Sequence, residues 1–169
     1  MTNVFYNEGE QHLLASYFQD EPVTFGPFYV GLGTGGAILN ENISLSDLVE
    51  ISDAGYARQV VNRDAGPNGW SLQSGFVESP VLEFTNTGQP CWAPADYVFL
   101  TLSPDGLNGD TTIIAATNFA NSELLVSGKR LRIIFRFRAR SGGLTHESNQ
   151  QASAYLVSNA LIFAEAVVI

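Results

Sequence analysis

Residues 131–140 constrain the fold of this chain more than any other segment. Apolar positions alternate there with arginines, the former at Leu131, Ile133, Phe135, Phe137 and Ala139 and the latter at Arg132, Arg136, Arg138 and Arg140. Successive side chains of a β-strand point to opposite faces, so this pattern predicts a strand with one face in the core and one in solvent. Only Ile134 breaks the alternation.

Further strands are expected on either side of this one. They are predicted at 28–32, 56–62, 70–78, 81–85, 96–102 and 111–117, with a turn at 66–69. The segment 96–102 is apolar on both faces, which is typical of a central strand. Helical spacing predicts short helices at 8–19 and after Ser148, and one or two helical turns within 44–50. The pattern predicts an all-β fold, a jelly-roll-like β-sandwich with short peripheral helices at the N- and C-terminal ends.

Length and composition predict one domain. The 169 residues, 45% of them hydrophobic, suffice for one core, and no repeat or linker divides them. We expect a single β-sandwich domain over residues 1–169, with residues 1–7 as an N-terminal arm and 144–169 as a C-terminal extension. Residues 160–169 are apolar but shorter than the roughly 20 residues of a membrane span, so they are expected as a buried strand or helix, or docked on a neighbour.

The start of the chain and its charge restrict where it works. No basic stretch followed by an apolar run opens the sequence, so no signal peptide is expected and the chain is predicted to be made in the cytoplasm. Eight basic against 17 acidic residues give a net charge of −9, which argues against nucleic acid and anionic membrane as partners. Charged residues make up 15%, below the roughly 25% of typical domains. Either partners bury part of the surface, or uncharged polar residues cover it.

One motif resembles a cofactor site. Residues 31–36, Gly-Leu-Gly-Thr-Gly-Gly, match the G-x-G-x-x-G pattern of dinucleotide-binding loops, and Asp53 follows Gly33 by 20 residues. That chemistry requires the third glycine to begin a helix within alternating strands and helices. Residues 37–42 do not predict a helix. We therefore expect a flexible loop and no cofactor.

Other catalytic patterns are weak. His12 and His146 have no partner at metal-ligand spacing, and Cys91, the only cysteine, permits neither a disulfide within the chain nor a cysteine-based metal cluster and is expected to pack. Glu78 and Glu83 could pair as glycosidase carboxylates, although solvated surface is the expected role. We expect no enzyme and no metal site.

A carbohydrate- or receptor-binding sandwich is the alternative from another class. It would expose rings such as Trp70, Trp92 or Tyr97 beside acidic residues in a cleft. An assembly protein would bury these rings or place them in interfaces.

Six of the eight basic residues fall within twelve positions: Lys129, Arg130, Arg132, Arg136, Arg138 and Arg140. Like charges on one strand face repel each other unless carboxylates neutralise them, and guanidinium groups suit carboxylates. Two hypotheses stand side by side, with nucleic acid a minor third. The basic residues form salt bridges within their own subunit, or they contact another subunit.

Four short segments together resemble small bacteriophage virion structural proteins. They are Phe28-Tyr29-Val30-Gly31-Leu32-Gly33, Ala54-Gly55-Tyr56-Ala57-Arg58-Gln59-Val60, Leu82-Glu83-Phe84-Thr85 before Trp92, and Gly128-Lys129-Arg130-Leu131. The resemblance covers about residues 8–140, and residues 141–169 depart from it as an apolar tail. It implies a jelly-roll-like sandwich displayed on a virion.

The role that the resemblance implies is a capsid decoration or cement protein, a homotrimer that binds between capsid subunits. A tail, neck or fibre component is the alternative. The expected partners are further copies of this chain and the major capsid protein or another virion protein. Besides the basic residues, the interface candidates are Val4, Phe5, Tyr6, Leu161, Ile162, Phe163, Val167, Val168 and Ile169.

Overall fold

The computed structural model describes residues 3–5, 26–36, 44–63, 66–73, 76–88, 90–104, 112–141 and 160–168. Within these ranges the strands are β1 (Asn3–Phe5), β2 (Phe28–Gly33), β3 (Gln59–Val61), β4 (Ser71–Gln73), β5 (Phe76–Glu78), β6 (Leu82–Thr85), β7 (Ala95–Thr101), β8 (Ile113–Glu123), β9 (Arg130–Ser141) and β10 (Ala160–Val168). One 3-10 helix, η1 (Leu45–Asp47), confirms the helical turn expected within 44–50. The helices expected at 8–19 and after Ser148 lie outside the described residues.

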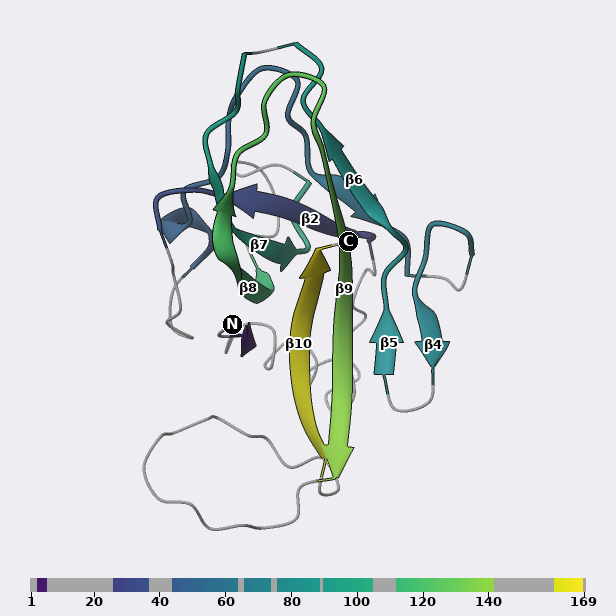
Figure 1. Ribbon diagram of the computed structural model, residues 1–169. Coiled ribbons are helices and arrows are strands. Elements are labelled where there is room, and N and C mark those ends of the chain that lie inside the picture. Colours follow the sequence, from purple (N-terminus) through teal and green to yellow (C-terminus); the bar gives the residue numbers. More distant parts are fainter. Residues whose placement is uncertain are drawn as a thin grey trace.

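The strands form two antiparallel sheets, so the described part of the chain is mostly β, as predicted. The first sheet has the order β1-β8-β7-β2-β3, and the second has the order β10-β9-β5-β4, with β6 also paired to β9. In Figure 1, β2 runs across the view, whereas β9 and β10 run along it. One hydrophobic cluster takes side chains from β2, β3, β7 and β8 of the first sheet and from β6 and β9 of the second. The two sheets therefore share a core.

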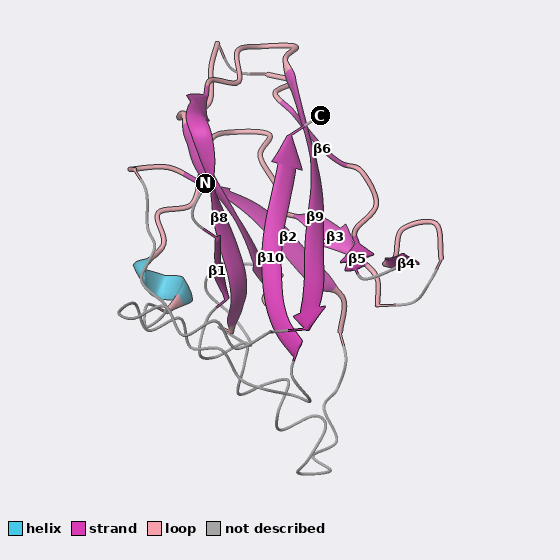
Figure 2. Cartoon of the chain, turned by 60° about the horizontal axis from the view of Figure 1, so that its bottom comes forward, coloured by secondary structure: helices cyan, strands magenta, loops and turns pink. Residues whose placement is uncertain are grey.

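The terminal strands lie side by side. β1 is an edge of the first sheet and pairs with β8, while β10 is an edge of the second and pairs with β9. β1 and β10 also contact each other, and Figures 1 and 2 show them adjacent. The expected tail strand is thus found at 160–168, on the sheet of its own chain.

β9 shows the predicted alternation. Leu131, Ile133 and Phe135 are buried in the shared core, while Arg130 and Arg132 are exposed on the other face, the outer face of the second sheet. β6 pairs with residues 130–133 of β9, and β5 pairs with residues 136–138. Both short strands therefore lie end to end along one side of β9.

A β-bulge separates β5 from β6. Residues 79–81 lie opposite only two residues of β9, 134 and 135, so one residue is extra on this side. The N–H of Ser79 donates to the carbonyl oxygen of Phe135 (2.8 Å), and the Ser79 hydroxyl accepts from the Phe135 N–H (2.9 Å). That hydroxyl also donates to the carbonyl of Pro80 (2.9 Å). The bulge thereby accommodates Pro80, which has no N–H to donate, while the N–H and the carbonyl of Phe135 on the partner strand both keep a hydrogen bond.

Three expected strands differ from the structure by more than one residue at an end. The single strand predicted at 70–78 is wrong, because β4 and β5 form a hairpin in which Gln73 pairs with Phe76. Two residues, Ser74 and Gly75, join these strands, and a two-residue connection containing glycine is a common hairpin signal. The strand expected at 56–62 is limited to 59–61, and the one expected at 111–117 spans Ile113–Glu123.

β7 is buried on both faces, as its sequence predicts. Val98 and Leu100 belong to the core between the sheets. Tyr97 and Phe99 point to the opposite face, where they pack with Leu45 of η1 in a second cluster. A central strand covered on both sides explains why 96–102 carries apolar residues at successive positions.

Candidate interaction surface

Two glycines of the G-x-G-x-x-G match allow aromatic rings of β7 to pack against the backbone of β2. Gly31 and Gly33 of β2 pair with Phe99 and Tyr97 of β7, and a Cβ on either glycine would overlap the opposite ring. Glycine is needed here because an aromatic ring crosses the backbone. The first two glycines of the match are therefore part of a sheet. Gly36, with φ +94°, lies in the loop that follows.

Two aspartates near this motif accept hydrogen bonds from backbone N–H groups. Asp53 accepts a hydrogen bond from the N–H of Ala93 (2.7 Å), and Asp96 accepts one from the N–H of Gly36 (2.8 Å). The Ser122 hydroxyl also donates to Asp96, and this bond and that from Gly36 lower the pKa of the Asp96 carboxyl. Asp53 thus holds the segment around Ala93 in place. In a dinucleotide-binding site, an acidic residue at this spacing would bind the ribose instead.

A buried ion pair lies beside β2. Arg58 donates from Nε and Nη2 to the two carboxylate oxygens of Glu50 (2.8 and 2.6 Å) and from Nη1 to the carbonyl of Ser103 (2.7 Å). The Tyr56 hydroxyl donates to Glu50 (2.8 Å) and accepts from the N–H of Leu32 (2.8 Å). Burial, reinforced by the charge of Glu50, raises the pKa of Tyr56. The cluster joins residues 50–58 to β2 and to the end of β7.

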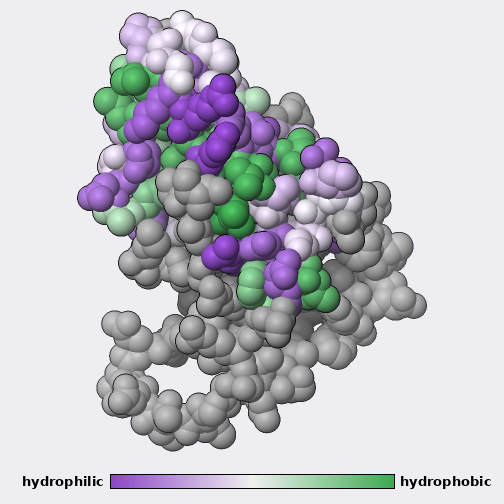
Figure 3. All heavy atoms as spheres, turned by 45° about the vertical axis from the view of Figure 1, so that its right-hand side comes forward, coloured by the Kyte–Doolittle hydropathy of each residue, from purple (hydrophilic) through white to green (hydrophobic). Residues whose placement is uncertain are grey.

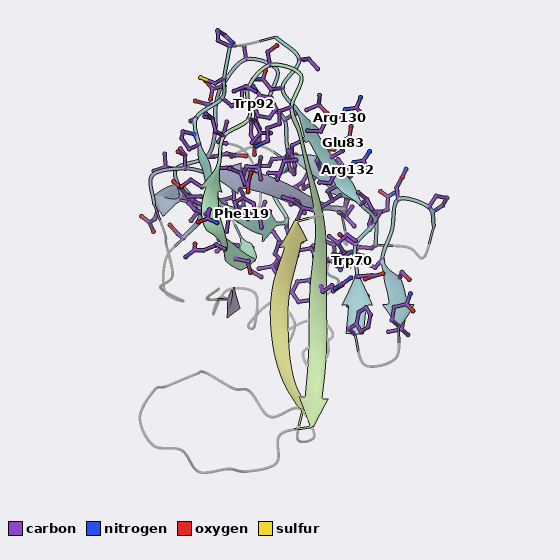
Figure 4. All side chains as sticks on the ribbon, viewed as in Figure 1. Trp70, Glu83, Trp92, Phe119, Arg130 and Arg132 are labelled. Carbon is purple, nitrogen blue, oxygen red and sulfur yellow. The ribbon has the colours of Figure 1, made fainter. Side chains whose placement is uncertain are left out.

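Two of the three rings proposed for sugar binding are in the core. Trp92 and Tyr97 are both buried, and the Trp92 indole N–H donates to the carbonyl of Ala54 (3.3 Å) (Figure 4). Neither ring can stack on a ligand in solution. Trp70 is half-buried, and it packs edge-on against Phe28 with ring centroids 5.6 Å apart. Of the three, it alone reaches a surface groove.

Cys91 is exposed, so the expectation that it packs is wrong. Its neighbour Trp92 points into the core instead. Successive extended residues point to opposite sides, and the large ring takes the inward position. His12 and His146 lie outside the described residues.

The outer face of the second sheet carries arginine–glutamate pairs (Figure 4). Arg132 donates from Nε to Glu83 (2.9 Å), and Arg130 approaches the other carboxylate oxygen of Glu83 (3.3 Å). Arg136 donates from Nε to Glu78 (2.9 Å). These contacts are possible because β5 and β6 place both glutamates beside β9.

The hypothesis of salt bridges within the subunit is thereby confirmed for four of the six basic residues. Lys129 is the fourth, and its ammonium group lies 3.3 Å from Glu123. The side chains of Arg138 and Arg140 lie outside the described part of the chain. Contact of the basic residues with another subunit stays a prediction.

The same pairs bear on the glycosidase hypothesis. The hydrogen bond from Arg132 is the main cause that lowers the pKa of Glu83. A general acid of a glycosidase needs a raised pKa. Glu78 is likewise bonded to Arg136, so the sheet assigns both carboxylates to ion pairing.

A groove with both apolar and polar lining residues lies beside these ion pairs. It has a volume of about 560 Å³, and its lining includes Pro67, Trp70, Leu72, Pro80, Val81 and Ile134. Val81 is 52% exposed. Leu72 is 85% exposed, but it shares the face of Val77 and Phe137, opposite to that of the ion pairs. Ile134, which breaks the alternation of β9, lies on the outer face between the positions of Arg132 and Arg136. Figure 3 brings this side forward and shows hydrophobic groups next to strongly hydrophilic ones.

The terminal interface candidates lie on edge strands or outside the described part. Their backbones place Val4 and Phe5 in β1 and Leu161, Ile162, Phe163, Val167 and Val168 in β10. Tyr6 and Ile169 are outside the described residues. Because both strands pair within the chain, an arm reaching a neighbour is not needed to account for them. Their contact with other chains stays a prediction.

Among the residues described, no group of three or more His, Cys, Asp and Glu could hold a metal ion. None of the described helices has the length and apolar character needed to cross a membrane. No protein-family model matches the chain, and no curated protein matches its sequence.

Proposed function

We propose that this chain is a structural subunit of a bacteriophage virion, a jelly-roll-like sandwich that acts without catalysis. In this role it is a capsid decoration or cement protein that stabilises the head by binding between capsid subunits. The proposal draws on the sequence resemblance. The segments that carry it include β2, residues 54–60 at the start of β3, β6 and the start of β9, and β2, β6 and β9 contribute side chains to the shared core.

The outer face of the second sheet is the observation that carries the proposal. Protein interfaces combine an apolar centre with a polar rim and are enriched in arginine and aromatic residues. Here a groove lined by the exposed Val81 and by Ile134 lies beside the ion pairs of Glu78 and Glu83. This arrangement suits contact with another protein.

Rigidity also supports a structural role. A surface that is ordered before binding loses less conformational entropy when it binds. The two sheets share one core, and the Glu50–Arg58 pair fixes the long connection between β2 and β3. The contact face is built on strands of this framework.

Two alternative functions differ from the decoration role in the partner that the chain would bind. A tail, neck or fibre component would use the same kind of surface at another place on the virion. A glycan- or receptor-binding module would need exposed rings, and the burial of Trp92 and Tyr97 weighs against it. Binding of the isolated protein to a glycan array would favour the module.

Addition of the purified protein to virus heads that lack it tests the decoration role. We expect saturable binding to heads and release of the packaged genome at a higher temperature. Val81→Ser should weaken binding, whereas Val60→Ser, a matched change on the edge strand β3, should not. Binding to isolated tails but not to heads would overturn the decoration role.

A further inference from the structure

Charge is segregated within this chain. The twelve residues from 129 to 140 contain six of the eight basic residues and no acidic one, while the remainder contains all 17 acidic residues. The two other basic residues are Arg58 and Arg63, and Arg58 is neutralised by Glu50. A basic strand therefore lies in an otherwise strongly acidic protein.

The ion pairs leave positive charge on the outer face. Arg130 and Arg132 share Glu83, and within the described residues no second carboxylate pairs with either. Their side chains are 60% and 51% exposed. A guanidinium group has several N–H donors, and each of these groups uses one nitrogen on Glu83. Because more than half of each side chain is exposed, these guanidinium groups are accessible to carboxylates from outside.

The groove adds a second component to this face. Val81 precedes Leu82, whose side chain is in the core, so Val81 points to the outer face, where it lines the groove together with Ile134 and is 52% exposed. Burial of such a side chain against a partner is favourable by the area it removes from water. The surface thus offers apolar area and unfilled cationic donors together.

We propose that this face binds the acidic surface of a second copy of the same chain. Complementary charge argues for this occupant, because every copy carries both the basic face and the acidic remainder. The inference rests on the proposed function, because it specifies which surface joins the copies of the homo-oligomer expected there. It assigns the contact to the outer face of β5, β6 and β9.

The contact is head to tail. A two-fold axis through this face would bring Arg130 and Arg132 of one copy against the same residues of the other, and such like-charge contact is unfavourable. A contact between different surfaces avoids this repulsion. Repeated around a rotation axis, it closes into a ring, and three copies would give the expected trimer.

Sedimentation velocity of the isolated protein tests the inference. At low salt and rising concentration we expect a closed oligomer of three or more copies, because each contact repeats until the ring closes. In about 1 M salt it should dissociate, since charge interactions are then screened beyond roughly 3 Å. A monomer at every concentration, or a two-fold dimer, would overturn the inference.

Two variants locate the contact. Arg130→Gln with Arg132→Gln removes the cationic donors, and Val81→Ser removes the exposed apolar group. Each should weaken association by about tenfold or more, which corresponds to roughly 1.4 kcal/mol. Lys129→Gln and Val60→Ser are the matched controls and should assemble like the wild type. Circular dichroism establishes that each variant is folded.

The outcomes separate this inference from the proposed function. Assembly unchanged in both variants would refute the assigned face. A monomeric protein that still binds virus heads would overturn the self-association and leave the virion role standing. A monomer that still binds heads is the result expected if the basic face binds an acidic head protein instead of another copy of the chain.

Discussion

The ring of Tyr97 crosses the backbone of Gly33, its partner between β7 and β2. Carbon atoms of the ring occupy the space that a Cβ on Gly33 would need. The Tyr97 hydroxyl donates to the carbonyl of Val49 and accepts from its N–H, both at 3.0 Å. One side chain therefore joins β7, β2 and the segment that precedes the Glu50–Arg58 pair.

Gly33→Ala should destabilise the fold. The added methyl group must displace the Tyr97 ring or the β2 backbone, and overpacking of this kind costs on the order of 1–3 kcal/mol. Denaturant unfolding measures the loss. Gly88→Ala is the control, since a Cβ there meets no atom within 4 Å. Equal stability of the two variants would show that the ring moves aside freely.

Arg58→Met should cost about 1–3 kcal/mol of unfolding free energy, because it leaves the partly buried Glu50 without its cation and removes one donor to the carbonyl of Ser103. The Arg58 side chain is only 5% exposed. Arg132→Met removes a similar group from a half-exposed pair and should cost under about 1 kcal/mol. A loss at Arg132 as large as that at Arg58 would contradict the assignment of a buried and a surface ion pair.

The stability should fall at high pH. Burial is the main cause that raises the pKa of Tyr97 to about 12, and it also raises the pKa of Tyr56. A phenol with a pKa raised above its unfolded value near 10 stabilises the fold fully below that pH and loses this contribution as the pH rises toward the folded value. The unfolding free energy should therefore decrease from about pH 10 upward. Tyr97→Phe should show a shallower decrease, and an equal slope would exclude this tyrosine as a cause.

Ser79→Ala should cost about 1–3 kcal/mol, because it leaves the buried N–H of Phe135 without an acceptor at the bulge. Thermal and denaturant unfolding both measure this change. Ser127→Ala alters an exposed serine in the turn before β9 and should stay within about 0.5 kcal/mol of wild type. If the two substitutions had the same effect, the Ser79 hydroxyl would not be needed to complete the bulge.

Local patterns predicted much of the fold. The alternation in 131–140 located β9 and its buried face, and the doubly apolar 96–102 segment located the central β7. The β4–β5 hairpin was missed, although Ser74-Gly75 is a recognisable turn pair. The pairing of strands distant in sequence, such as Gly33 with Tyr97, could not be derived because alternation does not specify which strands become neighbours.

The candidate surface was predicted only in part. The cluster of basic residues was evident in the sequence, and Glu78 and Glu83 were noted for a different chemistry. Their pairing with arginines depends on β5 and β6 lying along one side of β9, which a local pattern does not specify. The groove depends on the same arrangement together with the bulge at Pro80. Ile134, the exception in the alternation, was the one local signal that pointed to it.

Antibody labelling of purified virions tests the central claim most directly. Negative-stain images with an antibody against this chain should show label distributed over the head, as expected for a protein that binds between capsid subunits. Label confined to the tail, neck or fibres would assign the chain to the alternative component. If the virions carry no label, and the antibody also detects no chain among the denatured virion proteins, the structural role is contradicted.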